Sequence, residues 1–158
     1  MIKIMFVCHG NICRSPMAEF IFKDLIEKEG IADRFLVCSS ATSTEEIWGE
    51  VGNPVYPPAK LELNSHGISC EGKRAVQLRS SDSDKYDFFI GMDDYNINNM
   101  KRMLNPSAHG KIFKLLEFIS SAKDVYDPWY SRDFKSCYDD ILEGCKALLT
   151  YIKKAHAI

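Results

Sequence analysis

The sequence predicts one α/β domain with three layers, in which helices flank a central four-stranded parallel sheet. Four short runs are apolar along their whole length, as expected for strands that are covered on both faces. They are Lys3–Val7, Phe35–Cys38, Phe88–Met92 and Ile112–Leu116. Helical periodicity fills the intervals between these runs, and this alternation predicts parallel strands joined by right-handed crossovers.

The first strand is predicted to lead into a helix from Ser15-Pro16 to Gly30. Proline is favoured at the first position of a helix, and glycine just past its end. One face of this segment is apolar and carries Met17, Phe20, Ile21 and Leu25. After the second strand, the segment Ala41–Pro58 is rich in Gly and Pro and is predicted to be a long loop. A helix from about Pro58 to His66 follows it.

Two further helices are predicted after the third and fourth strands. One begins after Asp93-Asp94, carries three apolar residues on one face (Ile97, Met100 and Leu104) and ends before Asn105-Pro106. The last is the clearest, because its apolar residues keep one stripe over about five turns. That stripe consists of Phe134, Cys137, Tyr138, Ile141, Leu142, Cys145, Leu148, Leu149 and Ile152. No repeat or linker divides the chain, so residues 1–158 are predicted to be a single domain.

Charge and composition exclude several classes of partner. The formal net charge is −2, which does not predict binding to nucleic acid or to an anionic membrane. No apolar run approaches the roughly 20 residues that span a bilayer, and the first residues do not form an export signal. We therefore expect a cytoplasmic protein whose cysteines are reduced. These cysteines are Cys8, Cys13, Cys38, Cys70, Cys137 and Cys145.

The residues after the first strand have the pattern of an anion-binding loop. Ligands of parallel α/β sheets bind beyond the carboxyl ends of the strands. The segment turns through Gly10 and Asn11, two residue types that tolerate a left-handed backbone. It then enters a helix whose first N–H groups attract anions. A nucleotide-binding loop of the Walker type is not predicted, because no Gly-Lys-Ser/Thr is present.

Cys8 and Arg14 bring reactive chemistry to this loop. A thiolate is stabilised at a helix N-terminus and beside a guanidinium, and it is a strong nucleophile. The planar guanidinium can hold two phosphate oxygens at once. Ser15 can donate its hydroxyl to the thiolate, and Asn11 can brace the loop through its amide. The pattern predicts that a phosphate ester binds in this loop with its phosphorus facing the sulfur of Cys8.

The segment Val7–Pro16 closely resembles the active-site loop of the low-molecular-weight protein tyrosine phosphatases, and the resemblance extends from Lys3 to the final helix. It implies hydrolysis of phosphotyrosine and small aryl phosphates through a phosphocysteine on Cys8, without cofactor or metal, while Arg14 clamps the phosphate. The implied phosphate-binding loop consists of His9, Gly10, Asn11, Ile12, Cys13, Arg14 and Ser15. The expected partners are a phosphotyrosine-containing protein or peptide, and inorganic phosphate as product and competitive inhibitor.

Expelling a phenolate requires a proton donor. Asp127 lies in the segment Tyr126-Asp127-Pro128-Trp129-Tyr130, on a predicted loop after the fourth strand. Pro128 restricts the backbone and disfavours a helix at this point. The resemblance implies that Asp127 acts first as an acid and then as the base that activates the water molecule.

Phosphotyrosine also requires flat apolar walls, deep enough to exclude phosphoserine. Trp129 and Tyr130 are predicted to form these walls, together with Trp48 from the long loop. The resemblance further implies a buried polar network that holds the phosphate loop through hydrogen bonds. Its members are Asn11, Ser15, Ser39 and His66. His9 and the long segment Ala41–Gly52 depart from many relatives, and we expect them to influence substrate choice because they border the cleft.

Other functions fit the pattern less well. Arsenate reduction on the same fold needs resolving cysteines near Arg79–Met92, where this sequence has none. The protein-arginine phosphatases that this loop also resembles carry threonine in place of Ile12 and lack paired aromatic residues after Asp-Pro. A metal site made of Cys8, His9 and Cys13 matches no common zinc spacing. A non-catalytic phosphate-binding module would need neither a nucleophile nor an acid.

Cysteine chemistry adds one hypothesis. A reversible disulfide between Cys8 and Cys13 would protect the nucleophile from overoxidation. The expected oligomeric state is a monomer, or a weak self-association through the shallow face that the aromatic residues border.

Overall fold

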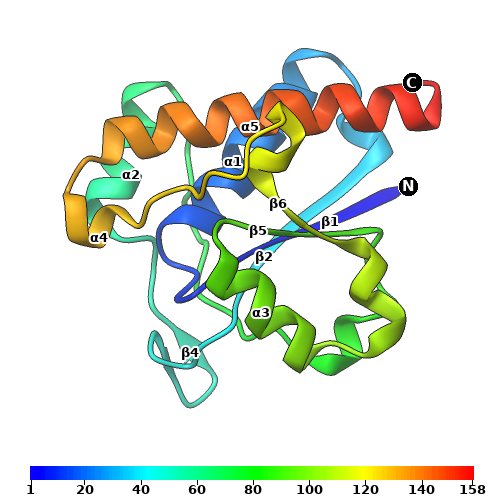
Figure 1. The fold of residues 1–158 in the computed structure, drawn as a ribbon. Coiled ribbons are helices and arrows are strands. Elements are labelled where there is room, and N and C mark those ends of the chain that lie inside the picture. The colour runs from blue at the N-terminus through cyan, green and yellow to red at the C-terminus, as the bar shows by residue number, and fades with distance from the viewer.

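The computed structural model describes residues 1–158 and contains the predicted parallel sheet. Its four strands lie in the order β2-β1-β5-β6, and each pair of neighbours is parallel (Figure 1). Their bounds are Ile2–Cys8 for β1, Phe35–Ala41 for β2, Phe88–Gly91 for β5 and Ile112–Lys114 for β6. The prediction of a four-stranded parallel sheet flanked by helices is therefore confirmed.

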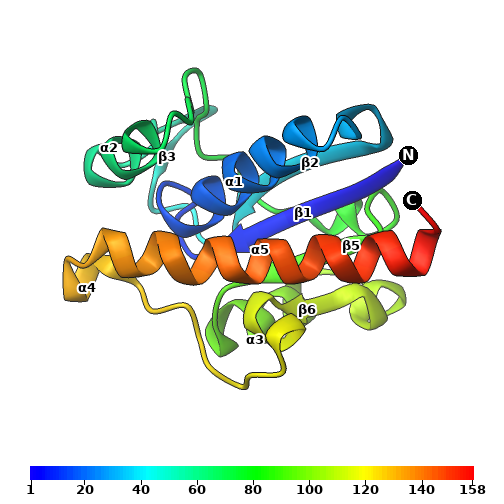
Figure 2. The ribbon, with the colours of Figure 1, turned by 90° about the horizontal axis from the view of Figure 1, so that it is seen from above.

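Helices cover both faces of the sheet. The longer helices are α1 (Arg14–Lys28), α2 (Pro57–Ser65), α3 (Asp94–Met103) and α5 (Phe134–His156). Figure 1 shows α1 and α5 above the sheet and α3 below it, and Figure 2 shows α5 running beside α1 along the sheet. None of the helices is both long enough and apolar enough to cross a membrane.

Strand β1 is apolar along its length because each of its two faces packs into a core. Ile4 and Phe6 pack into the larger core, which lies under α1 and α5. The residues between and after them, Met5 and Val7, pack into a smaller core with Met100 of α3. Successive side chains of a strand point to opposite faces, so a strand with a core on each side must be apolar at every position.

Short elements occupy the connections. The turns of 3₁₀ helix are η1 (Ala32–Arg34), η2 (Ser80–Asp82), η3 (Pro106–Lys111) and η4 (Leu115–Ile119). The fourth strand is thus shorter than predicted, because η4 begins at Leu115. The loop after β2 contains a small antiparallel hairpin of β3 (Ile47–Trp48) and β4 (Val51–Gly52), which was predicted only as loop.

The segment around Pro128 corrects a further prediction. Asp127 has an extended backbone, with φ −73° and ψ 112°, as expected for a residue before proline. However, the short helix α4 (Pro128–Ser131) begins at the proline itself. Proline is well tolerated at the first helical position because the N–H that it lacks would have no helical partner there. Pro128 therefore starts a helix instead of preventing one.

Candidate active site

The loop between β1 and α1 surrounds the sulfur of Cys8 with hydrogen-bond donors. The backbone nitrogens of Asn11 and Ser15 lie 3.3 and 3.4 Å from Sγ, and the Ser15 hydroxyl lies 3.0 Å from it. Asn11 has a left-handed backbone, with φ 59°, which turns its N–H towards the sulfur. The N-cap residue of α1, Cys13, makes no side-chain cap, and the Ser15 N–H in the first turn of the helix points at the Cys8 sulfur, so the positive end of α1 faces the place where an anion would bind.

The side chain of Asn11 connects this loop to β2. Its Nδ2 donates to the Ser15 hydroxyl at 2.7 Å and to the Ser39 hydroxyl at 2.9 Å. Its Oδ1 accepts from the backbone nitrogen of Val76 at 3.1 Å. Because the Ser15 oxygen accepts from Asn11, its own proton is free to point at the Cys8 sulfur. The predicted residues Asn11, Ser15 and Ser39 are thus brought together.

An ion pair between the buried Glu19 and the partly buried Lys73, which the sequence did not predict, ends this network. The Ser39 hydroxyl donates to Glu19 Oε1 at 2.6 Å, and Glu19 is 5% exposed. Lys73 Nζ lies 3.7 Å from the same carboxylate oxygen and donates to the Ser39 carbonyl at 3.0 Å. Burial lowers the pKa of Lys73, and the nearby Glu19 carboxylate opposes that shift.

His66 is not part of the network, so that expectation is corrected. It lies at the C-terminal end of α2, where Gly67 takes a left-handed backbone and ends the helix. Its ring stacks on Tyr138 of α5, with centroids 3.8 Å apart and planes at 4°. Glu62 lies 3.6 Å from its Nε2. The helix end directs His66 towards α5 and solvent, away from the phosphate loop.

Two hydrogen-bond acceptors, each from a segment that follows another strand, hold the guanidinium of Arg14. Its Nη1 donates to Asp93 Oδ2 and to the Val125 carbonyl, both at 2.8 Å, and the residue is 3% exposed. Burial lowers the pKa of Arg14, but the Cys8 sulfur and the Asp93 carboxylate more than offset this effect, so the pKa is raised. Arg14 therefore stays charged, and its Nη2, which makes no hydrogen bond within the protein, remains available to a ligand.

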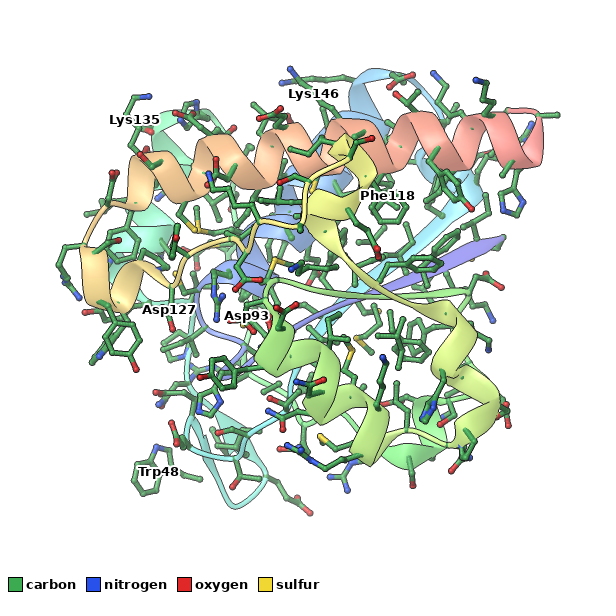
Figure 3. The ribbon with its side chains drawn as sticks, in the orientation of Figure 1. Trp48, Asp93, Phe118, Asp127, Lys135 and Lys146 are labelled. Atoms are coloured by element: carbon green, nitrogen blue, oxygen red, sulfur yellow. The ribbon has the colours of Figure 1, made fainter.

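Asp127 lies on the other side of this guanidinium. One carboxylate oxygen, Oδ1, accepts from the backbone nitrogen of Trp129 at 3.0 Å and so caps α4. The other, Oδ2, lies 3.7 Å from Arg14 Nη2. Figure 3 shows Asp127 and Asp93 at the same edge of the sheet. The α4 cap therefore orients Asp127 with one oxygen free towards the loop.

A pocket of about 330 Å³ opens above the phosphate loop. Among its lining residues are Cys8, Arg14 and Asp127, together with the aromatic side chains of Trp129 and Tyr130. The complete lining is Cys8, His9, Gly10, Asn11, Ile12, Cys13, Arg14, Glu45, Glu46, Tyr56, Asp127, Trp129 and Tyr130. Nucleophile, guanidinium and carboxylate predicted from the sequence thus border one cavity.

The aromatic wall differs from the prediction at two positions. Tyr56, which the sequence analysis missed, lines the pocket and has its ring centroid 5.2 Å from that of Trp129. Trp48 does not line the pocket; it lies on β3 and is 72% exposed (Figure 3). Its cross-strand partner, Val51, is exposed as well, so this face of the hairpin is turned towards solvent.

All six cysteines are free thiols. Cys13 lies beside Cys137 of α5. The pKa of Cys13 is raised well above its usual range, mainly by a hydrogen bond with the Cys137 thiol and also by burial. The disulfide between Cys8 and Cys13 stays a prediction. Residues 1–158 contain no group of three or more His, Cys, Asp or Glu side chains placed to hold a metal ion.

Comparison with known proteins places this geometry in a family. A family model described as low molecular weight phosphotyrosine protein phosphatase matches residues 3–157. The chain belongs to this family. The low molecular weight protein-tyrosine-phosphatase YfkJ of Bacillus subtilis is 38% identical over 98% of this chain and 97% of its own. The low molecular weight protein-tyrosine-phosphatase PtpA of Staphylococcus aureus is 37% identical over 98% of this chain and 96% of its own.

Solved structures of the family show the same fold. The crystal structure of YfkJ superposes with a TM-score of 0.89 at 36% identity, over 98% of this chain and 96% of that one. The Drosophila arginine phosphatase DARP superposes with a TM-score of 0.86 at 29% identity, over 96% of this chain and 98% of that one. Membership makes this chain a cysteine-dependent phosphatase whose substrates are phosphate esters or phosphoproteins.

Proposed function

We propose that this protein hydrolyses phosphotyrosine through a phosphocysteine intermediate on Cys8, with Arg14 binding the phosphate and Asp127 as acid and base. One observation carries the proposal. Cys8, Arg14 and Asp127 all border one pocket, although Asp127 lies more than a hundred residues along the chain from the other two. Residues 1–158 would act together as one catalytic domain.

In the first step, the thiolate of Cys8 attacks phosphorus and forms the S–P bond while the bond from phosphorus to the phenolic oxygen breaks. Asp127 gives its proton to that leaving oxygen. The charge on the phosphoryl oxygens is stabilised by Arg14 and by the backbone N–H groups of the loop, which are in place before the reaction. Tyrosine leaves, and phosphocysteine remains.

In the second step, Asp127 removes a proton from water, whose oxygen attacks phosphorus. The S–P bond breaks, its electron pair returns to Cys8, and inorganic phosphate is released. The Ser15 hydroxyl at 3.0 Å can stabilise the thiolate that forms. Phosphate is therefore expected to bind the free enzyme as a competitive inhibitor. Arg14 and the amides supply the positive charge that both steps need, so we expect turnover in the presence of EDTA.

The pocket favours an aryl phosphate. Tyr56, Trp129 and Tyr130 line it with aromatic surface, and Ile12 adds a bulky apolar side chain at the loop. A phenyl ring can pack between such walls while its phosphate reaches the loop, whereas phosphoserine is too short to use them. The same features disfavour phosphoarginine, the substrate that the name of DARP indicates for that protein.

The proposal includes two properties of the protein as a whole. We place it in the cytoplasm, because a thiolate nucleophile requires a reducing compartment to stay active. We also propose that it acts as a monomer, or through weak self-association by the face around Trp129 and Tyr130, which are 55% and 84% exposed.

The test compares turnover of p-nitrophenyl phosphate, phosphotyrosine, phosphoserine and phosphoarginine in EDTA, and turnover of arsenate in EDTA with a thiol reductant. We expect hydrolysis of the first two substrates, with no measurable turnover by Cys8→Ser. Asp127→Ala should slow the aryl phosphates by roughly 10²–10⁴. The exposed Asp84→Ala is the control and should keep the wild-type rate. Turnover by Cys8→Ser, or a preference for phosphoarginine or arsenate, would disprove the proposal.

A further inference from the structure

The pocket has an unusual charge balance for a site that binds a phosphate dianion. Arg14 is the only lysine or arginine that lines it, whereas three carboxylates do so: Glu45, Glu46 and Asp127. The charge of Arg14 is already faced by Asp93 at 2.8 Å and by Asp127 at 3.7 Å. Two carboxylates, Glu45 and Glu46, therefore have no role in holding the guanidinium.

These two carboxylates are fixed at the edge of the pocket. Glu45 is 69% exposed, and its Oε2 lies 3.0 Å from Nε2 of His9, the residue after the nucleophile. Glu46 Oε2 accepts from Asn53 Nδ2 at 2.7 Å. The Glu46 Cγ lies so close to Gly10 that a Cβ built there would be 3.2 Å from it. Each carboxylate thus uses one oxygen in these contacts and leaves the other available.

The position of these groups determines which part of a substrate they meet. The phosphate goes to the bottom of the pocket, and the tyrosine ring packs against the aromatic wall. Glu45 lines the pocket and is 69% exposed, so it lies at the rim, and Glu46 follows it in the chain. We expect the polypeptide on either side of the tyrosine to leave the pocket past this rim. The other cation near the mouth, Arg132, lies over the rings of Tyr56 and Trp129 and is not part of the pocket lining.

On the basis of the proposed function, we propose that Glu45 and Glu46 make this enzyme selective for phosphotyrosine flanked by lysine or arginine. A flanking cation pairs with these carboxylates, whereas a flanking aspartate or glutamate is repelled by them. Each pair is exposed to solvent, so each contributes a modest factor, about two- to fivefold. Together they predict roughly a tenfold preference at low ionic strength, which falls as salt screens the charges.

The test uses phosphotyrosine peptides that differ only in the residues next to the phosphotyrosine, which are lysine, glutamine or glutamate. We expect kcat/KM to fall in that order, with the ratio of the lysine to the glutamate peptide reduced several-fold by about 0.5 M salt. In the variant Glu45→Gln/Glu46→Gln, whose side chains keep their shape, the same ratio should fall to about two or less. Glu50→Gln, which removes an exposed carboxylate from the same hairpin outside the pocket lining, should keep the wild-type ratio.

The outcomes separate this inference from the proposed function. Failure of the wild-type protein to hydrolyse p-nitrophenyl phosphate would disprove the phosphatase function itself. Normal hydrolysis of that compound with equal kcat/KM for the three peptides would disprove only the selectivity. The selectivity is also disproved if the double glutamine variant keeps the wild-type ratio, or if Glu50→Gln abolishes it.

Discussion

At the scale of single residues, the Ser15 hydroxyl is the group whose hydrogen-bond direction matters most. It accepts from Asn11 Nδ2 at 2.7 Å, which leaves its proton for the Cys8 sulfur at 3.0 Å. A hydroxyl held in this way donates to a thiolate without first having to rotate. It therefore stabilises the sulfur both before attack and when the phosphocysteine is hydrolysed.

Ser15→Ala removes this donor and leaves the size of the side chain almost unchanged. A hydrogen bond to a charged group contributes about 1.5–3 kcal/mol, so kcat for p-nitrophenyl phosphate should fall about 10- to 100-fold. Alkylation of Cys8 by iodoacetate at neutral pH should slow as well. Ser40→Ala is a matched control, because the buried Ser40 hydroxyl has no hydrogen-bond partner. An unchanged alkylation rate in Ser15→Ala would show that the hydroxyl does not act on the sulfur.

Residues that act through local spacing could be predicted from the sequence itself, whereas residues that act through distant contacts were found only where the family resemblance indicated them, as for Ser39 and Asp127. Cys8, Arg14 and Ser15 share one loop, so their meeting follows from the chain itself. Glu19 was missed because its bond to Ser39 joins two side chains twenty residues apart, with no motif to indicate it. His66 was assigned to the network by resemblance alone, and the end of α2 directs it elsewhere.

At the scale of the elements, Asp93 links the start of α3 to the guanidinium. Its Oδ1 accepts from the backbone nitrogen of Asn96 at 2.8 Å and caps the helix. Its Oδ2 accepts from Arg14 at 2.8 Å. The sequence indicated the cap, because Asp93 precedes a helical stripe. The contact with Arg14 depends on β5 lying next to β1, which the sequence did not reveal.

Two substitutions of Asp93 separate these roles. Asp93→Ala removes the cap and the partner of the buried Arg14, so we expect a stability loss of about 3 kcal/mol or more and a lower kcat/KM. Asp93→Asn can still cap α3 but presents an amide donor to Arg14. It should lose about 1 kcal/mol less stability than Asp93→Ala, because it keeps the cap, while kcat/KM for p-nitrophenyl phosphate falls about tenfold. Urea unfolding and steady-state kinetics measure both. Wild-type kinetics in Asp93→Asn would mean that Asp93 does not orient the guanidinium.

Gly144 marks the closest approach of α5 to η4. A Cβ at this position would lie 2.6 Å from Cγ of Leu115, a fully buried side chain. Gly144→Ala gains about 0.5–1 kcal/mol of helix propensity, but overpacking costs about 1–3 kcal/mol. We therefore expect a net loss of about 1 kcal/mol in urea unfolding. Combining it with Leu115→Ala should cost less than the sum of the two single changes, since the new methyl group enters the vacated space. Full additivity would contradict this packing.

The elements that the sequence missed are too short to show a period. The strands β3 and β4 have two residues each, and α4 has four. A periodic pattern needs at least two repeats to be recognised, so only the Gly and Pro residues of Ala41–Pro58 and Pro128 were visible. The long stripe of α5 shows the converse, because over several turns the apolar spacing leaves no alternative to a helix.

At the scale of the whole molecule, the strand order brings the site together. In the order β2-β1-β5-β6, the carboxyl ends of β1 and β5 are neighbours, so the loop after Cys8 meets Asp93. The chain after β6 returns to the same edge, where the Val125 nitrogen donates to the Met92 carbonyl at 2.9 Å and places Asp127 nearby. Parallel strands were predictable from apolar runs, whereas their order was not, because many orders satisfy the same alternation.

Burial in the finished fold also predicts how global stability depends on pH. Cys145 is fully buried in the larger core, and burial raises the pKa of its thiol. In the unfolded chain a thiol loses its proton near pH 8.5, while folded Cys145 keeps it. Above that pH the unfolded state binds fewer protons than the folded state, so stability falls as pH rises. Burial also raises the pKa of Cys70, whereas the lowered pKa of Lys73 acts in the opposite direction.

Comparison with Cys145→Ala isolates the contribution of this thiol. Urea unfolding at pH 8, 9 and 10 should show the free energy of unfolding of wild type falling more steeply than that of the variant. The difference in slope should approach about 1.4 kcal/mol per pH unit above pH 9, the value for one proton. The variant will be less stable at neutral pH because it loses core volume, but the slope does not depend on that offset. Parallel curves for the two proteins would mean that Cys145 ionises without unfolding, and that the core between α1 and α5 admits water at high pH.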